Sequence, residues 1–72
     1  MKINIRTSLG KKIKELRNKR KLTQEELAYE TGIDYKYLQR IEGKTPPNIK
    51  IETIEKLAKA LNVKPAKLLD FN

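Results

Sequence analysis

The chain has 72 residues, which is enough for one small domain that buries about 60% of the surface of its unfolded chain. It contains no cysteine and no histidine, which excludes disulfide bonds, zinc sites of the usual Cys/His kind, thiol nucleophiles and Ser-His-Asp catalysis. The net charge of +8 indicates a polyanionic partner, with nucleic acid favoured over a membrane; the alternative is that the lysines only solvate a helical surface.

No apolar run approaches the roughly 18 residues of a membrane span, and the first residues lack the apolar core of a signal peptide. We therefore expect a cytoplasmic protein that does not contact the membrane. The composition predicts no metal, no cofactor and no small-molecule ligand. An enzyme is not expected either, because the carboxylates are scattered and no apolar pocket is indicated that would shift their pKa values.

Residues 1–7 are interpreted as a frayed N-terminal arm; an arm whose Lys2 and Arg6 lie along phosphates stays open as an alternative. The alternation of Ile3 and Ile5 leaves a short strand open as a second interpretation.

A first helix is expected over residues 8 to about 20, because Leu9, Ile13 and Leu16 follow helical spacing and form one apolar stripe. Basic side chains occupy most of the other faces. Gly10 weakens the first turn by about 1 kcal/mol relative to alanine.

Residues 23–43 carry two helix-start signals separated by a glycine. Thr23 is followed three residues later by Glu26, which is a capping box, and Asp34 can cap a second helix that runs to about residue 42. Gly32 ends the first of these helices in the left-handed conformation that glycine adopts at low cost. Two helices joined by a glycine-containing turn form a helix-turn-helix. The residues flanking the two caps form hydrophobic staples: Leu22 with Leu27, and Ile33 with Leu38.

The second helix of this pair directs Leu38 and Ile41 inward and leaves a polar face outward. That face consists of Tyr35, Lys36, Gln39 and Arg40, with Tyr37 at its boundary. Arginine and lysine can chelate guanine O6 and N7, and glutamine can pair with adenine N6 and N7. The face therefore suits the groove of a nucleic-acid duplex.

The segment GKTPPN is predicted to be a loop, because two prolines prevent a helix from continuing. A fourth helix is expected over residues 51–61, ended by Asn62 in the left-handed conformation, and a fifth from Pro65 to about Leu69.

Residues 27–41 carry the structural positions of the helix-turn-helix of phage Cro and cI repressors: Leu27, Ala28, Gly32, Ile33, Leu38 and Ile41. The wider pattern, LRNKRKLTQEELA, GIDYKYLQRIEGK and IEKLAKALNV, resembles the Cro/cI-type (XRE) domain over nearly the whole chain. This resemblance implies an all-α, five-helix, lambda-repressor-like fold in one domain over residues 1–72. It also implies a sequence-specific double-stranded DNA-binding transcriptional regulator.

Within this family, the run NIKIETIEK and the position of Tyr37 are similar to restriction–modification controller proteins. A phage-type repressor and an antitoxin that represses its own operon stay open as alternatives. An alternative of another class is a module on the same fold that binds a protein or RNA.

The resemblance also assigns roles to residues. It implies base contacts by Tyr35, Lys36 and Arg40, to which the chemistry of the outward face adds Gln39. Phosphate contacts are expected from the start of the helix-turn-helix, from the boundary tyrosine and from the loop: Thr23, Gln24, Tyr37, Lys44 and Thr45. For Tyr37 a packed aromatic ring is the alternative. A partly buried ion pair between Arg17 and Glu42 is likewise implied by the resemblance.

One recognition helix reads too few base pairs to single out an operator, so a homodimer on a pseudo-palindromic site is expected. The C-terminal helices, residues 51–71, carry surplus apolar residues that are candidates for the dimer interface: Leu68, Leu69 and Phe71. The alternative is that these residues close the core of the monomer.

Overall fold

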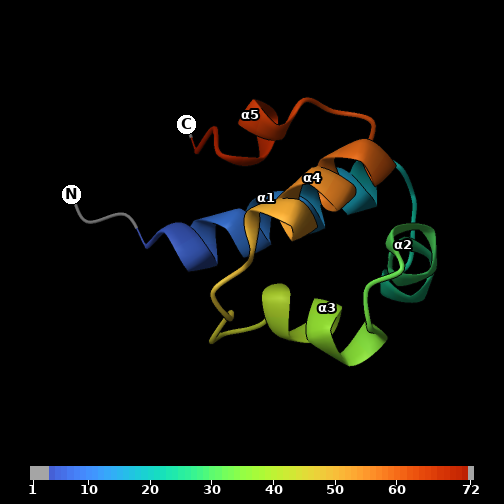
Figure 1. Ribbon diagram of the computed structural model, residues 1–72, viewed down its shortest axis with the longest axis horizontal. Coiled ribbons are helices and arrows are strands. Elements are labelled where there is room, and N and C mark those ends of the chain that lie inside the picture. The colour runs from blue at the N-terminus through green and yellow to red at the C-terminus, as the bar shows by residue number, and fades with distance from the viewer. Residues whose placement is uncertain (1–3, 72) are drawn as a thin grey trace.

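The computed structural model describes residues 4–71, which form five α-helices and, within that range, no strand. The helices are α1 (Ile5–Lys19), α2 (Gln24–Thr31), α3 (Tyr35–Ile41), α4 (Ile51–Ala60) and α5 (Pro65–Leu68). Figure 1 shows α3 on one side of α1 and α4, α5 on the opposite side, and α2 closing one end. The expected all-α fold of five helices is confirmed. None of the helices in residues 4–71 has the length and apolarity needed to span a bilayer.

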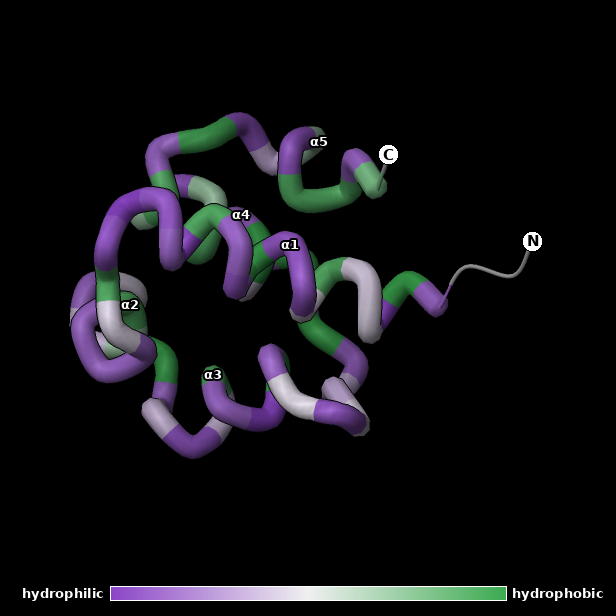
Figure 2. Tube along the Cα trace, turned by 180° about the vertical axis from the view of Figure 1, so that it is seen from behind, coloured by the Kyte–Doolittle hydropathy of each residue, from purple (hydrophilic) through white to green (hydrophobic). Residues whose placement is uncertain are grey.

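The core is built from one apolar stripe on each helix. Figure 2 shows hydrophobic and hydrophilic segments alternating along α1 and α4, as expected for helices with one buried face. Burying each large aliphatic side chain contributes about 1.5–3 kcal/mol, so these residues supply most of the folding free energy. The buried core residues are Leu9, Ile13, Leu16, Leu27, Ala28, Leu38, Ile41, Leu57, Ala58, Leu61 and Leu68.

The first helix begins three residues earlier than predicted. Asn4 is its N-cap, and the Oδ1 of Asn4 accepts a hydrogen bond from the backbone N–H of Thr7 at 3.2 Å. Residues 5–7 are therefore helical, which corrects the arm interpretation for these three residues and the interpretation of Ile5 as part of a strand. The alternating isoleucines concealed the capping asparagine between them. Lys2 and Ile3 lie outside the described residues.

The start signals of the helix-turn-helix act as predicted. At the start of α2 the Thr23 hydroxyl accepts from the backbone N–H of Glu26 at 3.0 Å, and the Glu26 carboxylate accepts from that of Thr23 at 2.8 Å. Gly32 ends α2 with φ of 72°. Asp34 then caps α3 by accepting from the backbone N–H of Tyr37 at 3.3 Å. These local bonds set where α2 stops and where α3 begins.

The crossing of α1 and α3 explains why Gly10 is a glycine. It is buried, and a Cβ atom at this position would overlap the backbone carbonyl oxygen of Ile41. The lack of a side chain therefore lets two helix backbones approach closely. Helix propensity had identified only its cost to the first turn of α1.

Replacing Gly10 with alanine sets two effects of opposite sign against each other. Helix propensity alone predicts a gain of about 1 kcal/mol in the free energy of unfolding. Overpacking costs about 1–3 kcal/mol, and a backbone carbonyl cannot yield by changing rotamer. We expect the overlap to dominate, so that Gly10→Ala lowers the urea midpoint. Asn18→Ala, at an exposed position of the same helix, is the control and should gain about 0.5 kcal/mol. A stabilised Gly10→Ala protein would contradict the close crossing.

Candidate nucleic-acid interface

Helix α3 has one buried side and one exposed side. Leu38 and Ile41 are fully buried and fix the helix on the core. The four side chains expected to contact bases all lie on the exposed side: Tyr35, Lys36, Gln39 and Arg40. Tyr37 is partly buried and packs against the core cluster, as its boundary position suggested. The structure therefore brings the predicted readers together on one helix face.

This face continues into the loop that follows α3. An open groove of about 500 Å³ is lined by Lys36, Gln39, Arg40, Gly43, Lys44 and Thr45. Among the described residues none of its three cationic side chains forms an ion pair. Their charge is therefore not compensated by an ion pair within residues 4–71, and the exposed side chains suit a phosphate backbone or the acceptor atoms of base edges.

The double proline holds this loop against the protein. Pro46 is buried and Pro47 is partly buried, while Lys44 and Thr45 just before them are exposed. Because the prolines supply the contact with the protein, the preceding residues are free to face a ligand beside α3.

The start of α2 combines free backbone donors with two side chains that already have partners. The Thr23 oxygen is used by the capping box, but its hydroxyl proton remains free to be donated. The amide of Gln24 donates through Nε2 to Oε1 of Glu42 at 3.1 Å, which leaves one side-chain N–H and the helix-start backbone N–H groups for an anion. The two predicted phosphate contacts therefore lie beside the end of α3.

Arg17 and Glu42 form the ion pair that the family resemblance implied. Arg17 donates through Nε and Nη2 to the two carboxylate oxygens of Glu42, both at 2.9 Å, and through Nη1 to the carbonyl of Leu22 at 2.7 Å. The side chain of Glu42 is 2% exposed. The hydrogen bonds and the charge of Glu42 raise the pKa of Arg17 above its ordinary value, and burial opposes them. No buried side-chain polar atom of the described residues lacks a partner.

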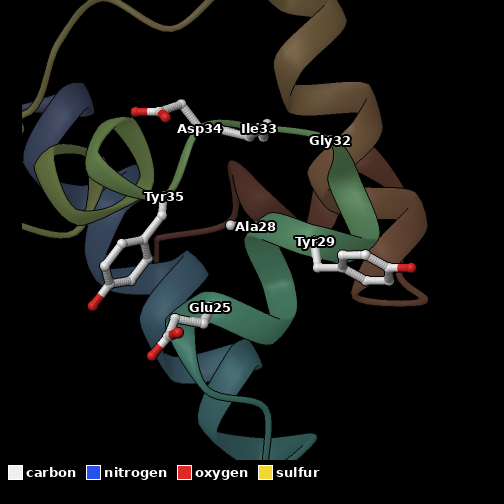
Figure 3. A pocket seen from close by; sticks show the side chains of 7 residues that line it. All are labelled: Glu25, Ala28, Tyr29, Gly32, Ile33, Asp34 and Tyr35. Carbon is white, nitrogen blue, oxygen red and sulfur yellow. The ribbon is translucent and has the colours of Figure 1, made fainter.

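A second depression, of about 640 Å³, lies at the turn between α2 and α3 (Figure 3). Its walls carry the carboxylates of Glu25 and Asp34 and the rings of Tyr29 and Tyr35, over an apolar floor that includes Ala28. Its negative charge makes it unsuited to a phosphate, and the described residues contain no group of side chains suited to hold a metal. The basic groove is therefore the better candidate for a nucleic-acid site.

The three apolar residues near the C-terminus occupy different environments. Leu68 is fully buried in the core of the chain, which corrects its assignment to a dimer interface. Phe71 is partly buried and packs against the core, whereas Leu69 is 48% exposed. Ile51, the first residue of α4, is 80% exposed. Apolar surface is thus present near both C-terminal helices: at Leu69, which was among the expected residues, and at Ile51, which was not.

Comparisons with known proteins agree with this geometry. A family model described as helix-turn-helix matches residues 13–68. Control protein C.BamHI of Bacillus amyloliquefaciens is 42% identical over 69 residues, covering 94% of this chain and 84% of that protein. The crystal structure of the restriction-modification controller protein C.AhdI from Aeromonas hydrophila superimposes with a TM-score of 0.81 at 35% identity, covering 86% of this chain and 92% of that one.

A third similar structure was determined with nucleic acid. SinR, described as the master regulator for biofilm formation and crystallised in complex with DNA, superimposes with a TM-score of 0.81 at 34% identity. The match covers 86% of this chain and 98% of that one.

Removing Glu42 leaves the Arg17 guanidinium buried without its counter-charge. We expect Glu42→Ala to lower the free energy of unfolding by about 3–5 kcal/mol in urea denaturation. Because both side chains belong to one pair, Arg17→Ala combined with Glu42→Ala should lose less than the sum of the single losses. The control is Glu15→Ala, which removes an exposed pair with Lys19 at 3.7 Å and should cost under about 1 kcal/mol. Additive losses at Arg17 and Glu42 would rule out direct coupling.

Proposed function

The chain belongs to the helix-turn-helix family, and on that premise we propose that it is a sequence-specific double-stranded DNA-binding transcriptional regulator. One observation carries this function: the exposed side of α3 and the adjoining loop present cationic side chains that no acidic group of the described residues compensates. A protein- or RNA-binding module on the same fold is not favoured, because this face has the groups that read a DNA groove. We expect regulation rather than catalysis, and a cytoplasmic location.

Recognition begins with α3 entering the major groove. Helices of this kind place the side chains of their first turn, and those one turn later, against base edges. Lys36 and Arg40 have the donors that chelate the O6 and N7 of guanine, and the amide of Gln39 suits adenine. Tyr35 lies on the same face.

Contacts to the DNA backbone set the register of α3. Lys44 and Thr45 lie in the loop after α3 and contact phosphates, and Thr23 and Gln24 do so from the start of α2, which lies beside the end of α3. The backbone N–H groups and the positive dipole end of α2 favour a phosphate there. Tyr37 contributes its hydroxyl at the edge of the groove. These contacts position the protein and carry no sequence information themselves.

Specificity for an operator requires a second copy of the chain. A two-fold dimer places two α3 helices in successive major grooves about 34 Å apart. The exposed apolar residues Leu69 and Ile51, together with the partly buried Phe71, are the residues we assign to this homodimer. Occupancy of such a site blocks or contacts the polymerase. The similarity to C.BamHI and C.AhdI supports a controller of a restriction–modification operon over a phage-type repressor.

Variants at Arg40 and Lys44 distinguish a contact to a base from a contact to a phosphate. Selection from a random duplex pool at fixed salt supplies the preferred site. On that site Arg40→Ala should cost about 1–3 kcal/mol and relax one base pair per half-site. Lys44→Ala, the matched variant, should weaken every duplex alike and lower the slope of log K against log salt by about one. If the native protein enriches no duplex, the proposed function is wrong; a uniform loss in Arg40→Ala would make Arg40 a phosphate contact.

The dimer surface is tested by placing a charge on it. Leu69→Asp should give a folded monomer by analytical ultracentrifugation at tens of micromolar, with loss of cooperative binding to the selected site. Ile5→Asp is the control, because it makes the same change at an exposed apolar residue of α1. A native protein that is monomeric both free and on its selected site would exclude the homodimer.

A further inference from the structure

The base-reading face of α3 contains one hydrogen bond between side chains. Nε2 of Gln39 donates to the hydroxyl oxygen of Tyr35 at 3.1 Å. The two residues are four positions apart, so their side chains lie one above the other on the same side of the helix. Both side chains are exposed, and Lys36 and Arg40 on the same face have no bonded partner among the described residues. Gln39 is thus the one reader whose head group is held in place before any ligand binds.

We propose that Tyr35 is a positioning residue, which orients the amide of Gln39 so that the Tyr35–Gln39 pair selects adenine as a unit. This inference rests on the proposed DNA-binding function and deepens it, because it names a base and assigns that base to a residue. It also changes the role predicted for Tyr35, which was expected to contact a base itself.

The chemistry of the amide makes its orientation decisive. A glutamine side chain has two N–H donors on Nε2 and one carbonyl acceptor, Oε1. When one N–H is donated to Tyr35, the second N–H and Oε1 remain for a ligand. This donor and acceptor match the N7 acceptor and the N6 donor of adenine in the major groove.

The opposite orientation of the amide would select another base. With Oε1 against the tyrosine hydroxyl, both N–H donors would face the groove, and two donors match the O6 and N7 acceptors of guanine. The direction of the bond therefore determines which purine Gln39 prefers, and here Gln39 donates to Tyr35. Without it the amide would rotate freely and distinguish the purines less well.

Tyr35 is suited to hold the amide because its own position is restrained. It is the first residue of α3, directly after the Asp34 cap, and it is 39% exposed. Figure 3 shows its ring leaving the start of α3 at the depression between α2 and α3, which it lines together with Ala28 and Ile33. A tyrosine side chain has only two torsion angles to fix, so it provides a rigid support at low entropic cost.

The test compares base preference among four proteins: native, Tyr35→Phe, Gln39→Ala and the double variant. Each is used to select duplexes from the same random pool at fixed salt. The native protein should enrich adenine at one position of each half-site, and Gln39→Ala should lose that preference. Because a hydrogen bond contributes modestly, Tyr35→Phe should reduce the preference for adenine over other bases about 3- to 10-fold. In the Gln39→Ala background Tyr35→Phe should have no further effect.

Two further variants sharpen the result. Gln39→Glu replaces the amide with an acceptor-only group, so the preference should move from adenine to cytosine, whose N4 is a donor. Tyr29→Phe is the control. It removes the same hydroxyl group from a ring on α2 that is 90% exposed, and it should leave the base preference unchanged. Thermal unfolding should be equal in native, Tyr35→Phe and Tyr29→Phe proteins, and Tyr29→Phe should also leave the affinity for random duplex unchanged.

Several results would overturn the inference while leaving DNA binding intact. Guanine in place of adenine would mean that the amide is reversed. An unchanged preference in Tyr35→Phe would mean that the bond has no role, and additive effects in the double variant would mean that Tyr35 reads a base independently. If the native protein enriches no duplex, the proposed function is wrong and the inference falls with it.

Discussion

The buried ion pair between Arg17 and Glu42 is the contact on which the interface depends. Helices of eight and seven residues, such as α2 and α3, are too short to be stable alone. The Arg17 guanidinium binds the carboxylate at the end of α3 and the Leu22 carbonyl just before α2, and Gln24 joins through Glu42. One network thus fixes both the helix that we propose faces the bases and the helix start that we propose faces the phosphates, because both are tied to the longer α1.

Such a pair is better understood as a geometric device than as a source of stability. Two charges lose hydration on burial, and an apolar replacement of similar volume often stabilises a protein as well or better. The planar guanidinium, however, donates two parallel hydrogen bonds to a carboxylate only in a narrow range of orientations. Gly10 acts in the same direction, since the contact of α1 with the Ile41 carbonyl leaves little freedom for α3 to tilt. The ion pair at Glu42 and the backbone contact at Ile41 involve adjacent residues at the end of α3, so both restrain the same end of that helix.

The sequence predicted best what depends on neighbouring residues. The capping box at Thr23, the left-handed Gly32 and the Asp34 cap involve residues within a few positions of each other, and all three formed as expected. One local signal was missed, the Asn4 cap that starts α1 three residues early. The other errors arose where tertiary packing decides. Helix propensity showed that Gly10 destabilises the first turn but not that the helix crossing requires a glycine there. The spacing of apolar residues could not show whether Leu68 faces the core or a partner. The Tyr35–Gln39 bond was only partly predictable from the sequence. The spacing of four residues permits the contact, but each side chain has other rotamers available.

The buried and the exposed side of α3 are therefore subject to different constraints. Leu38 and Ile41 must fill the core, and Glu42 must meet Arg17, so their identities are tied to the fold. The outward side chains contribute little to packing, because they are exposed, and a change among them costs little stability. For this reason the family identifies the scaffold and its mode of binding, whereas the bases that are read depend on a few side chains. Two of those side chains, Tyr35 and Gln39, are bonded to each other. We therefore propose that the unit of specificity is the pair, because a change in either residue alters what the other presents.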